Sequence, residues 1–214
     1  MIIGLTGKKN SGKDTAAKYL VENYGYERKA FADSLKKSVA ALFEIPFEKV
    51  DEYKDDKGGT LPRVEVVVDV ASPTRDEDGN MADFGHGTYQ YSMSWREFLQ
   101  RYGTESHREI FGYDFWVDQV LPYPHRDTES YSLSKEKLVI SDVRFDNEAL
   151  RVREYGGWVV EIVRPSLADV IDTHASEQIP KPDYQIINLD NNMSSLYTGL
   201  DEFMEWHGSS SKST

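Results

Sequence analysis

The sequence of 214 residues contains no cysteine, which excludes disulfide bonds, thiol nucleophiles and thiolate zinc sites. Its five histidines show no paired spacing of the kind that metal sites use. No apolar run approaches the roughly 18 residues of a membrane-spanning helix. The apolar start at residues 1–5 is too short for a signal peptide and lacks its basic region. We therefore expect a soluble protein of a reducing cytoplasm.

Basic side chains are also scarce, because 25 lysines and arginines stand against 37 acidic residues and the net charge is -12. This balance excludes a broad basic surface for a nucleic-acid backbone or an anionic membrane, so any phosphate site has to be local. A hydrophobic content of 39% suits one well-buried globular domain with appended segments.

Strand and helix patterns alternate along the chain, which predicts an α/β fold with a parallel five-stranded sheet flanked by helices. Apolar runs predict strands at residues 1–5, 28–31, 138–141, 158–163 and 184–189. Helical spacing predicts helices at residues 16–24, after an N-cap at Asp33, over about 14 residues after Ser94, and at residues 146–155 and 194–206. We expect a single domain at residues 1–207 and a disordered tail at residues 208–214.

An acidic, glycine-rich segment at residues 51–87 interrupts this alternation. Within it the β-branched run 64–70 predicts a strand, and residues 88–93 are its expected partner in a hairpin. The next helix starts with Ser-Trp-Arg-Glu at residues 94–97, which matches the capping box. Residues 51–93 are therefore expected to form a surface insertion.

Residues 7–13 read GKKNSGK and match the pattern G-x-x-x-x-G-K between a predicted strand and a predicted helix. Glycines allow backbone N–H groups to turn toward phosphate oxygens, the helix N-terminus adds a positive dipole end, and Lys13 can bridge the β- and γ-phosphates. The nucleotide contacts predicted here are Gly7, Asn10, Ser11, Gly12, Lys13, Asp14 and Thr15.

Two aspartates are candidates for holding Mg²⁺. Asp14 occupies the position where this loop usually has a Ser or Thr ligand, and it either approaches the metal or favours the helix dipole as a first-turn acid. Asp142 follows a predicted strand, where open α/β sheets bind their ligands. It is either a Walker-B-like residue or a cap of the next turn, and the nearby Arg144 is suited to phosphate charge.

Six segments in order resemble the phage-type deoxynucleoside monophosphate kinases of the P-loop nucleoside monophosphate kinase superfamily. They are residues 7–15 (GKKNSGKDT), 31–36 (FADSLK), 96–108 (REFLQRYGTESHR), 140–148 (ISDVRFDNE), 156–165 (GGWVVEIVRP) and 174–177 (HASE). The resemblance implies a P-loop kinase fold and Mg²⁺-assisted transfer of the γ-phosphoryl group of ATP to a deoxynucleoside monophosphate for DNA synthesis, in the host cytoplasm if the gene is viral. In that reaction Lys13, Arg144 and Arg164 are the candidate catalytic residues.

The acceptor site is expected across the cleft, on the side of the 51–93 subdomain. Arg96 and Gln100 share one face of the helix after Ser94 and are suited to a phosphate and a base edge. A solvated helix face and core aromatics are the alternatives for the single residues. The full set of acceptor candidates is Asp33, Lys36, Arg96, Gln100, Arg108, Trp116 and Asp142, with Phe115 as a second stacking candidate and Thr104 on the same helix face.

Residues 165–183 resemble the mobile lid of the superfamily, with His174, Ser176 and Glu177 either ordering the loop or touching the nucleotide, and residues 188–192 are a candidate wall for adenine. Nucleotides are the expected partners, nucleic acid and membranes are not, and a homodimer is left open. Two other functions fit the loop: another small-molecule kinase, such as one acting on dephospho-coenzyme A, and a nucleotide-dependent switch without turnover. The sequence lacks the Asn-Lys-x-Asp motif of guanine-reading switches.

Overall fold

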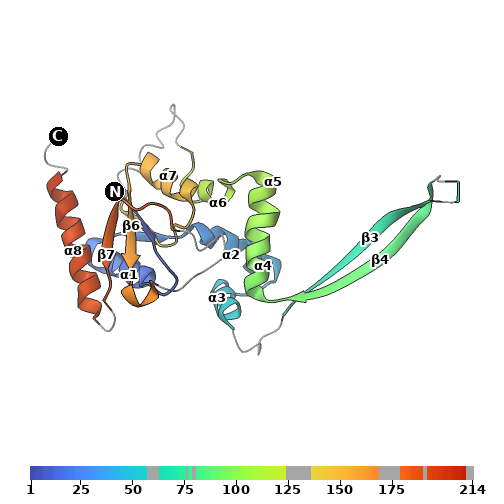
Figure 1. The fold of residues 1–214 in the computed structure, drawn as a ribbon, viewed down its shortest axis with the longest axis horizontal. Coiled ribbons are helices and arrows are strands. Elements are labelled where there is room, and N and C mark those ends of the chain that lie inside the picture. Colours follow the sequence, from blue (N-terminus) through green and yellow to red (C-terminus); the bar gives the residue numbers. More distant parts are fainter. Residues whose placement is uncertain are drawn as a thin grey trace. The chain divides into compact units, whose positions relative to one another are not determined.

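The computed structural model describes residues 1–56, 63–75, 77–78, 81–123, 136–168, 179–189 and 192–210. Contacts between Cα atoms divide the chain into two compact units (Figure 1). The first unit consists of Met1–Ser34 and Gly112–Thr214, and the second unit consists of Leu35–Phe111. Each unit is described separately, and the domain bounds expected from the sequence stay a prediction.

The first unit contains a sheet of five strands in the order β2-β5-β1-β6-β7, and every neighbouring pair is parallel. The central strand β1 (Ile2–Thr6) is buried along its whole length, as expected of a parallel strand covered on both faces. The other strands are β2 (Glu27–Lys29), β5 (Leu138–Ile140), β6 (Trp158–Val163) and β7 (Tyr184–Ile187). The predicted α/β fold with a parallel five-stranded sheet is confirmed.

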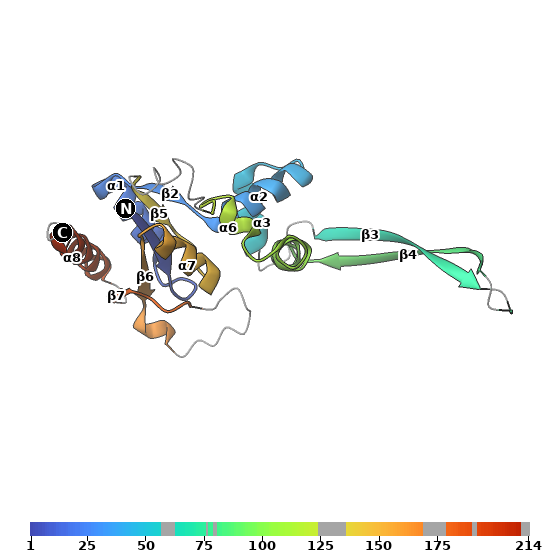
Figure 2. The same ribbon diagram turned by 90° about the horizontal axis from the view of Figure 1, so that it is seen from above.

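Helices cover both faces of this sheet (Figure 2). Helices α1 (Lys13–Tyr24) and α8 (Met193–Ser210) pack on one face, where Ile3 and Leu5 of β1 point. Helix α7 (Asp146–Glu154) packs on the opposite face with Ile2, because successive side chains of a strand alternate between its faces. The short helix α6 (Phe115–Asp118) adds Val117 to the same cluster as α7.

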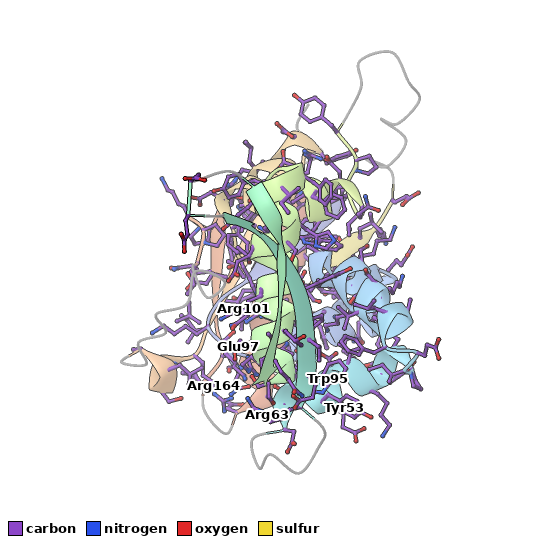
Figure 3. All side chains as sticks on the ribbon, turned by 90° about the vertical axis from the view of Figure 1, so that its right-hand side faces the viewer. Tyr53, Arg63, Trp95, Glu97, Arg101 and Arg164 are labelled. Carbon is purple, nitrogen blue, oxygen red and sulfur yellow. The ribbon has the colours of Figure 1, made fainter. Side chains whose placement is uncertain are left out.

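The second unit is built around α4 (Trp95–Gly103), which packs with α3 (Phe47–Asp55). Its core contains Val39, Val50 and Leu99, and the ring centroids of Tyr53 and Trp95 lie 4.9 Å apart (Figure 3). A π-helical turn at Thr104–Arg108 and the short α5 (Glu109–Phe111) follow α4. Helix α2 (Phe31–Leu42) begins in the first unit and contributes most of its residues to the second.

A long antiparallel hairpin of β3 (Val64–Arg75) and β4 (Met81–Met93) completes the second unit (Figure 1). The predicted pairing of residues 64–70 with 88–93 is confirmed, since Val64 lies opposite Met93 in the register. The ladder extends beyond the predicted strands on both sides of the turn. The predicted N-cap Ser94 is also confirmed, because its Oγ accepts a hydrogen bond from the backbone N–H of Glu97 at 3.2 Å.

Several element bounds differ from the sequence-based prediction. Helix α2 begins at Phe31, so Asp33 lies in its first turn and is not its N-cap. Helix α8 continues through Ser210, so residues 208–210 are helical and not a disordered tail. The short α3 and α6 were not predicted. The predicted roles of His174, Ser176 and Glu177 lie outside the described residues.

None of the helices in the described part of the chain is both long enough and apolar enough to cross a membrane.

Candidate phosphate-binding site

The loop between β1 and α1 has the backbone conformation that its glycines permit. Gly7 and Gly12 have φ angles of 131° and 110°, which side chains of L-residues rarely adopt. A Cβ atom on Gly7 would lie 2.5 Å from the carbonyl oxygen of Ile162, and one on Gly12 would lie 2.5 Å from Nδ2 of Asn188. The loop therefore lies directly against the carboxyl ends of β6 and β7, and only glycine fits at these two positions.

Lys13 lies in the first turn of α1 and reaches back across the loop. Its Nζ donates hydrogen bonds to the carbonyl oxygens of Gly7 at 2.7 Å and Lys8 at 2.8 Å. The backbone N–H of Ser11 also donates to the carbonyl of Lys8, at 3.1 Å. The ammonium group is thus held inside the loop, where a nucleotide phosphate would be received.

Two side chains that follow other strands bind the remaining part of the loop. Arg164, directly after β6, donates from Nη1 to the carbonyl oxygen of Asn10 at 3.2 Å. Asn188, directly after β7, donates from Nδ2 to the carbonyl oxygen of Ser11 at 2.7 Å. These donors bind the carbonyls of Asn10 and Ser11. The first-turn amides of α1 lack partners within the helix, so they are the groups suited to bind an anion.

Lys8 connects the loop to the segment after β6. Its Nζ donates to the carbonyl oxygens of Leu167 at 2.7 Å and Ala168 at 2.6 Å. These carbonyls end a single turn of 3₁₀-helix at Pro165–Leu167, and carbonyls at a helix C-terminus favour a cation. The start of the predicted lid segment at 165–183 is therefore attached to the loop between β1 and α1.

Asp142 caps a helix that begins far away in the sequence. Its Oδ1 accepts a hydrogen bond from the backbone N–H of Phe31 at 2.7 Å, and its Oδ2 accepts one from Ala32 at 2.9 Å. Both are first-turn amides of α2, which have no partner within that helix. Burial raises the pKa of Asp142, and these two hydrogen bonds oppose that rise. Of the two interpretations of Asp142, the structure shows a cap, but Asp142 caps α2 and not the turn that follows it in the sequence.

Asp14 and Thr15 lie in the first turn of α1, with the Asp14 carboxylate exposed. Both residues line an open cavity of about 430 Å³ between α1 and α8, together with Lys18, Tyr19, Glu22, Met193 and Tyr197. Among the described residues there is no group of three or more His, Cys, Asp or Glu side chains that could hold a metal ion. Mg²⁺ commonly uses only one or two carboxylates and takes its other ligands from phosphates and water, so this finding does not conflict with the predicted ligands.

Three buried hydroxyl groups lie in or next to this part of the sheet. The Oγ1 of Thr6, the Oγ of Ser11 and the Oγ of Ser141 have no hydrogen-bond partner within the part of the chain that the structure describes. Thr6 ends β1 and Ser141 follows β5, so both lie at the carboxyl edge of the sheet. Because buried polar groups are nearly always paired, these hydroxyls are suited to a ligand with oxygen or metal groups.

Arg144 lies in the turn between β5 and α7, and this turn is held by a buried carboxylate. Glu148 is 2% exposed, and its Oε2 accepts hydrogen bonds from the backbone N–H groups of Arg144 at 2.7 Å and Phe145 at 3.1 Å. Sequence reasoning missed this residue, although a Glu in the first turn of a predicted helix is a capping signal. Glu148 determines the backbone position from which the Arg144 side chain extends.

The acceptor candidates fall into two groups. Asp33, Trp116 and Asp142 belong to the first unit, and Lys36, Arg96, Gln100 and Arg108 belong to the second. In the second unit Lys36 pairs with Asp51 at 2.8 Å, and Arg96 pairs with Asp55 at 2.7 Å. Both carboxylates come from α3, so the acidic insertion supplies counter-ions to two cations of the predicted acceptor site.

Three of these candidates have surroundings that the sequence did not reveal. Trp116 is only 5% exposed and contacts Phe115 edge to face, so the alternative of a core aromatic describes its present position. Arg108 is 8% exposed in the π-helical turn, which breaks the regular spacing from Arg96. Asp33 pairs with Arg28 at 3.4 Å.

Comparisons with known proteins agree on one family. The model of the family described as deoxynucleotide monophosphate kinase matches residues 1–60 and 76–200. A protein of Acanthamoeba polyphaga mimivirus, provisionally named a deoxynucleotide monophosphate kinase, is 34% identical over 187 residues, which cover 83% of this chain and 80% of that protein. The deoxynucleotide monophosphate kinase of Enterobacteria phage T4 is 25% identical over 213 residues, which cover 82% of this chain and 86% of the phage protein.

Proposed function

Because the chain belongs to the deoxynucleotide monophosphate kinase family and is therefore a kinase, we propose that it transfers the γ-phosphoryl group of ATP to a deoxynucleoside monophosphate. The product would be the diphosphate, which supplies DNA synthesis. The loop between β1 and α1 supports the ATP part of the proposal. Lys13 and the first turn of α1 lie together at this loop. Arg164 and Asn188 bind the backbone carbonyls of Asn10 and Ser11.

The donor phosphates bind to the loop amides and to Lys13. The amides and the positive end of the α1 dipole provide hydrogen bonds to the phosphate oxygens. Lys13 exchanges its bonds to the carbonyls of Gly7 and Lys8 for the β- and γ-phosphates. Arg164 stands next to the loop and Arg144 follows β5, so both are proposed to neutralise the transferred group. Such a transfer needs positioning and charge neutralisation and no covalent side chain.

The residues near the loop fit Mg²⁺ by their chemistry. Asp14 and Thr15 offer hard oxygen donors at the end of the loop, and the unpaired hydroxyls of Thr6 and Ser141 lie at the same sheet edge. Asp142 keeps spare lone pairs besides the two hydrogen bonds to α2, so it could hold a water molecule bound to the ion. When bound, the ion would neutralise phosphate charge.

The acceptor is proposed to bind to cations and amides of the second unit. Its phosphate dianion would compete with Asp51 and Asp55 for Lys36 and Arg96, since a phosphate oxygen is at least as good a partner as a carboxylate. Gln100, one turn after Arg96 on α4, is proposed to read the base edge by its amide.

A coupled assay of ADP release, with each of the four deoxynucleoside monophosphates in turn, tests the proposal. We expect ADP release that depends on Mg²⁺ and rises strongly when at least one of these acceptors is added. Slow hydrolysis of ATP that no acceptor accelerates would contradict the proposal and favour a nucleotide switch. Turnover with another small phosphorylated acceptor alone would contradict the assigned substrate.

A further inference from the structure

Asn188 lies outside the sequence motif of the loop, yet it is bound to the loop's backbone. We propose that Asn188 is a positioning residue that holds the phosphate-binding loop in the conformation that receives ATP. The inference rests on the proposed function, because it assigns a residue to the ATP site of that reaction.

The position of Asn188 is determined by the sheet. It follows β7 directly, and its backbone N–H donates to the carbonyl oxygen of Val163 at 2.8 Å, next to the last paired residues of β6 and β7. The residue is 6% exposed. The sheet therefore fixes the backbone of Asn188. Its side-chain Nδ2 donates to the Ser11 carbonyl at 2.7 Å, across 177 positions of the sequence.

This single hydrogen bond determines the direction of a neighbouring amide. The peptide bond between Ser11 and Gly12 is planar and trans, so the carbonyl of Ser11 and the N–H of Gly12 point in opposite directions. When Asn188 holds the carbonyl, the N–H of Gly12 is turned the opposite way. Reversal of this peptide plane would present a carbonyl oxygen in place of the amide, and a carbonyl repels a phosphate group.

Gly12 is especially able to undergo such a reversal, because glycine populates both signs of φ. Its φ of 110° is one of several conformations open to it in the absence of a restraint. The side chain of Asn188 supplies that restraint from the side on which a Cβ of Gly12 would lie, at 2.5 Å from Nδ2. The Asn188 amide thus occupies the space that a side chain at position 12 would need, so the two residues are complementary in shape.

The test compares two variants of Asn188 with a matched control. Asn188→Ala removes the amide, and Asn188→Asp keeps its shape but presents an oxygen to the Ser11 carbonyl. Asn23→Ala is the control, because the Asn23 Nδ2 also donates to a backbone carbonyl, that of Tyr19 at 3.0 Å, but at an exposed position near the end of α1. The affinity for ATP with Mg²⁺ is measured by calorimetry without acceptor, the KM of the acceptor by the coupled assay, and folding by thermal unfolding.

We expect both Asn188 variants to raise the Kd of ATP by about 5- to 150-fold, the range for leaving a buried hydrogen-bonding group unpaired. The Asp variant should be the weaker binder of the two, because its charge adds repulsion of the phosphates. The KM of the acceptor should change by less than about twofold, and Asn23→Ala should bind ATP as the parent protein does.

Folded Asn188 variants with the parent's affinity for ATP would overturn the inference and leave the proposed function intact. An equal loss of affinity for ATP and acceptor, or failure of both variants to fold, would show a purely structural role and overturn it as well. A parent protein that does not bind ATP would overturn the proposed function and this inference together. If only the Ala variant fails to fold, the Asp variant decides between these outcomes.

Discussion

Replacement of Asp142 by asparagine tests whether this carboxylate holds the start of α2. The two carboxylate oxygens accept hydrogen bonds from the first-turn amides of Phe31 and Ala32, at 2.7 and 2.9 Å. Asparagine of the same shape keeps one acceptor oxygen but turns an NH₂ group toward the second amide. One charge-assisted hydrogen bond is therefore lost, and a first-turn amide of α2 is left facing another donor.

The expected magnitude follows from these contacts. Burial of the charge raises the pKa of Asp142 despite both hydrogen bonds, so loss of the charge itself is not the cost of the substitution. The cost comes from the amide of Phe31 or Ala32 that the NH₂ group leaves unpaired, and an unpaired buried group costs about 1–3 kcal/mol. We expect the free energy of unfolding to fall by about 1–2 kcal/mol. For a chain of this size the Tm should fall by about 2–8 °C.

Urea denaturation at pH 7, followed by circular dichroism, measures the change. Asp146→Asn is the matched control, because Asp146 is exposed in the first turn of α7, where the dipole contribution is about 0.5 kcal/mol. If Asp142→Asn costs no more than this control, the carboxylate does not hold α2 and the reasoning is refuted. A strong fall in kcat with an altered Mg²⁺ dependence is expected alongside, because the same residue follows β5 at the edge of the sheet where we propose that ATP binds.

The raised pKa of Asp142 also predicts how its contribution depends on pH. In the unfolded chain the pKa of an Asp is about 3.9, whereas burial raises the pKa of Asp142 in the folded protein. The folded state therefore binds the proton more tightly, and the stability linked to this proton is greatest below the unfolded pKa and is lost as the pH rises through the folded pKa. The difference in unfolding free energy between the parent and Asp142→Asn should change over that pH range and be constant above it.

Substitutions at four further residues test the remaining parts of the site. Lys13→Ala should lower kcat by about 100-fold or more with an unchanged fold, and a variant that keeps a tenth of the activity in the coupled assay would exclude Lys13 from the transition state. Arg96→Ala should raise the KM of all four acceptors by a similar factor, whereas Gln100→Ala should change their ranking. A common factor for all four in the Gln100 variant would show that it does not read the base. Glu148→Gln should retain part of the kcat, because the glutamine side chain can still accept a hydrogen bond from the 144–145 turn. Glu148→Ala cannot, and it should retain about a tenth of the kcat or less. Equal kcat values for the two variants would contradict this role.

Local patterns along the chain were sufficient for many elements of the fold. The strand at residues 158–163 has the predicted bounds, and the loop at residues 7–13 lies between a strand and a helix as its glycines and lysine indicate. The hairpin also follows from its β-branched run. In these segments the decisive interactions lie within a few residues of each other, so composition and spacing reveal them.

Helix α2 shows where such patterns fail. Asp33 is a good N-cap by residue type, yet the helix starts at Phe31 because Asp142, 111 positions away, accepts the hydrogen bonds of its first amides. The short α3 has only nine residues, and its stability depends on packing of Val50 against the second unit's core and not on its acidic sequence. Both features depend on contacts between distant segments.

The amino-acid sequence by itself determined the conformation of the loop at residues 7–13, because glycine suits the backbone at positions 7 and 12, and it placed Lys13 at a fixed spacing after them. It did not determine which residues hold that loop. The order β2-β5-β1-β6-β7 places β6 next to β1 and β7 one strand further, and so brings Arg164 and Asn188 to the carbonyls of Asn10 and Ser11. Strand order is set by packing of whole elements, and no spacing in the sequence encodes it, so only the tertiary structure decided these partners.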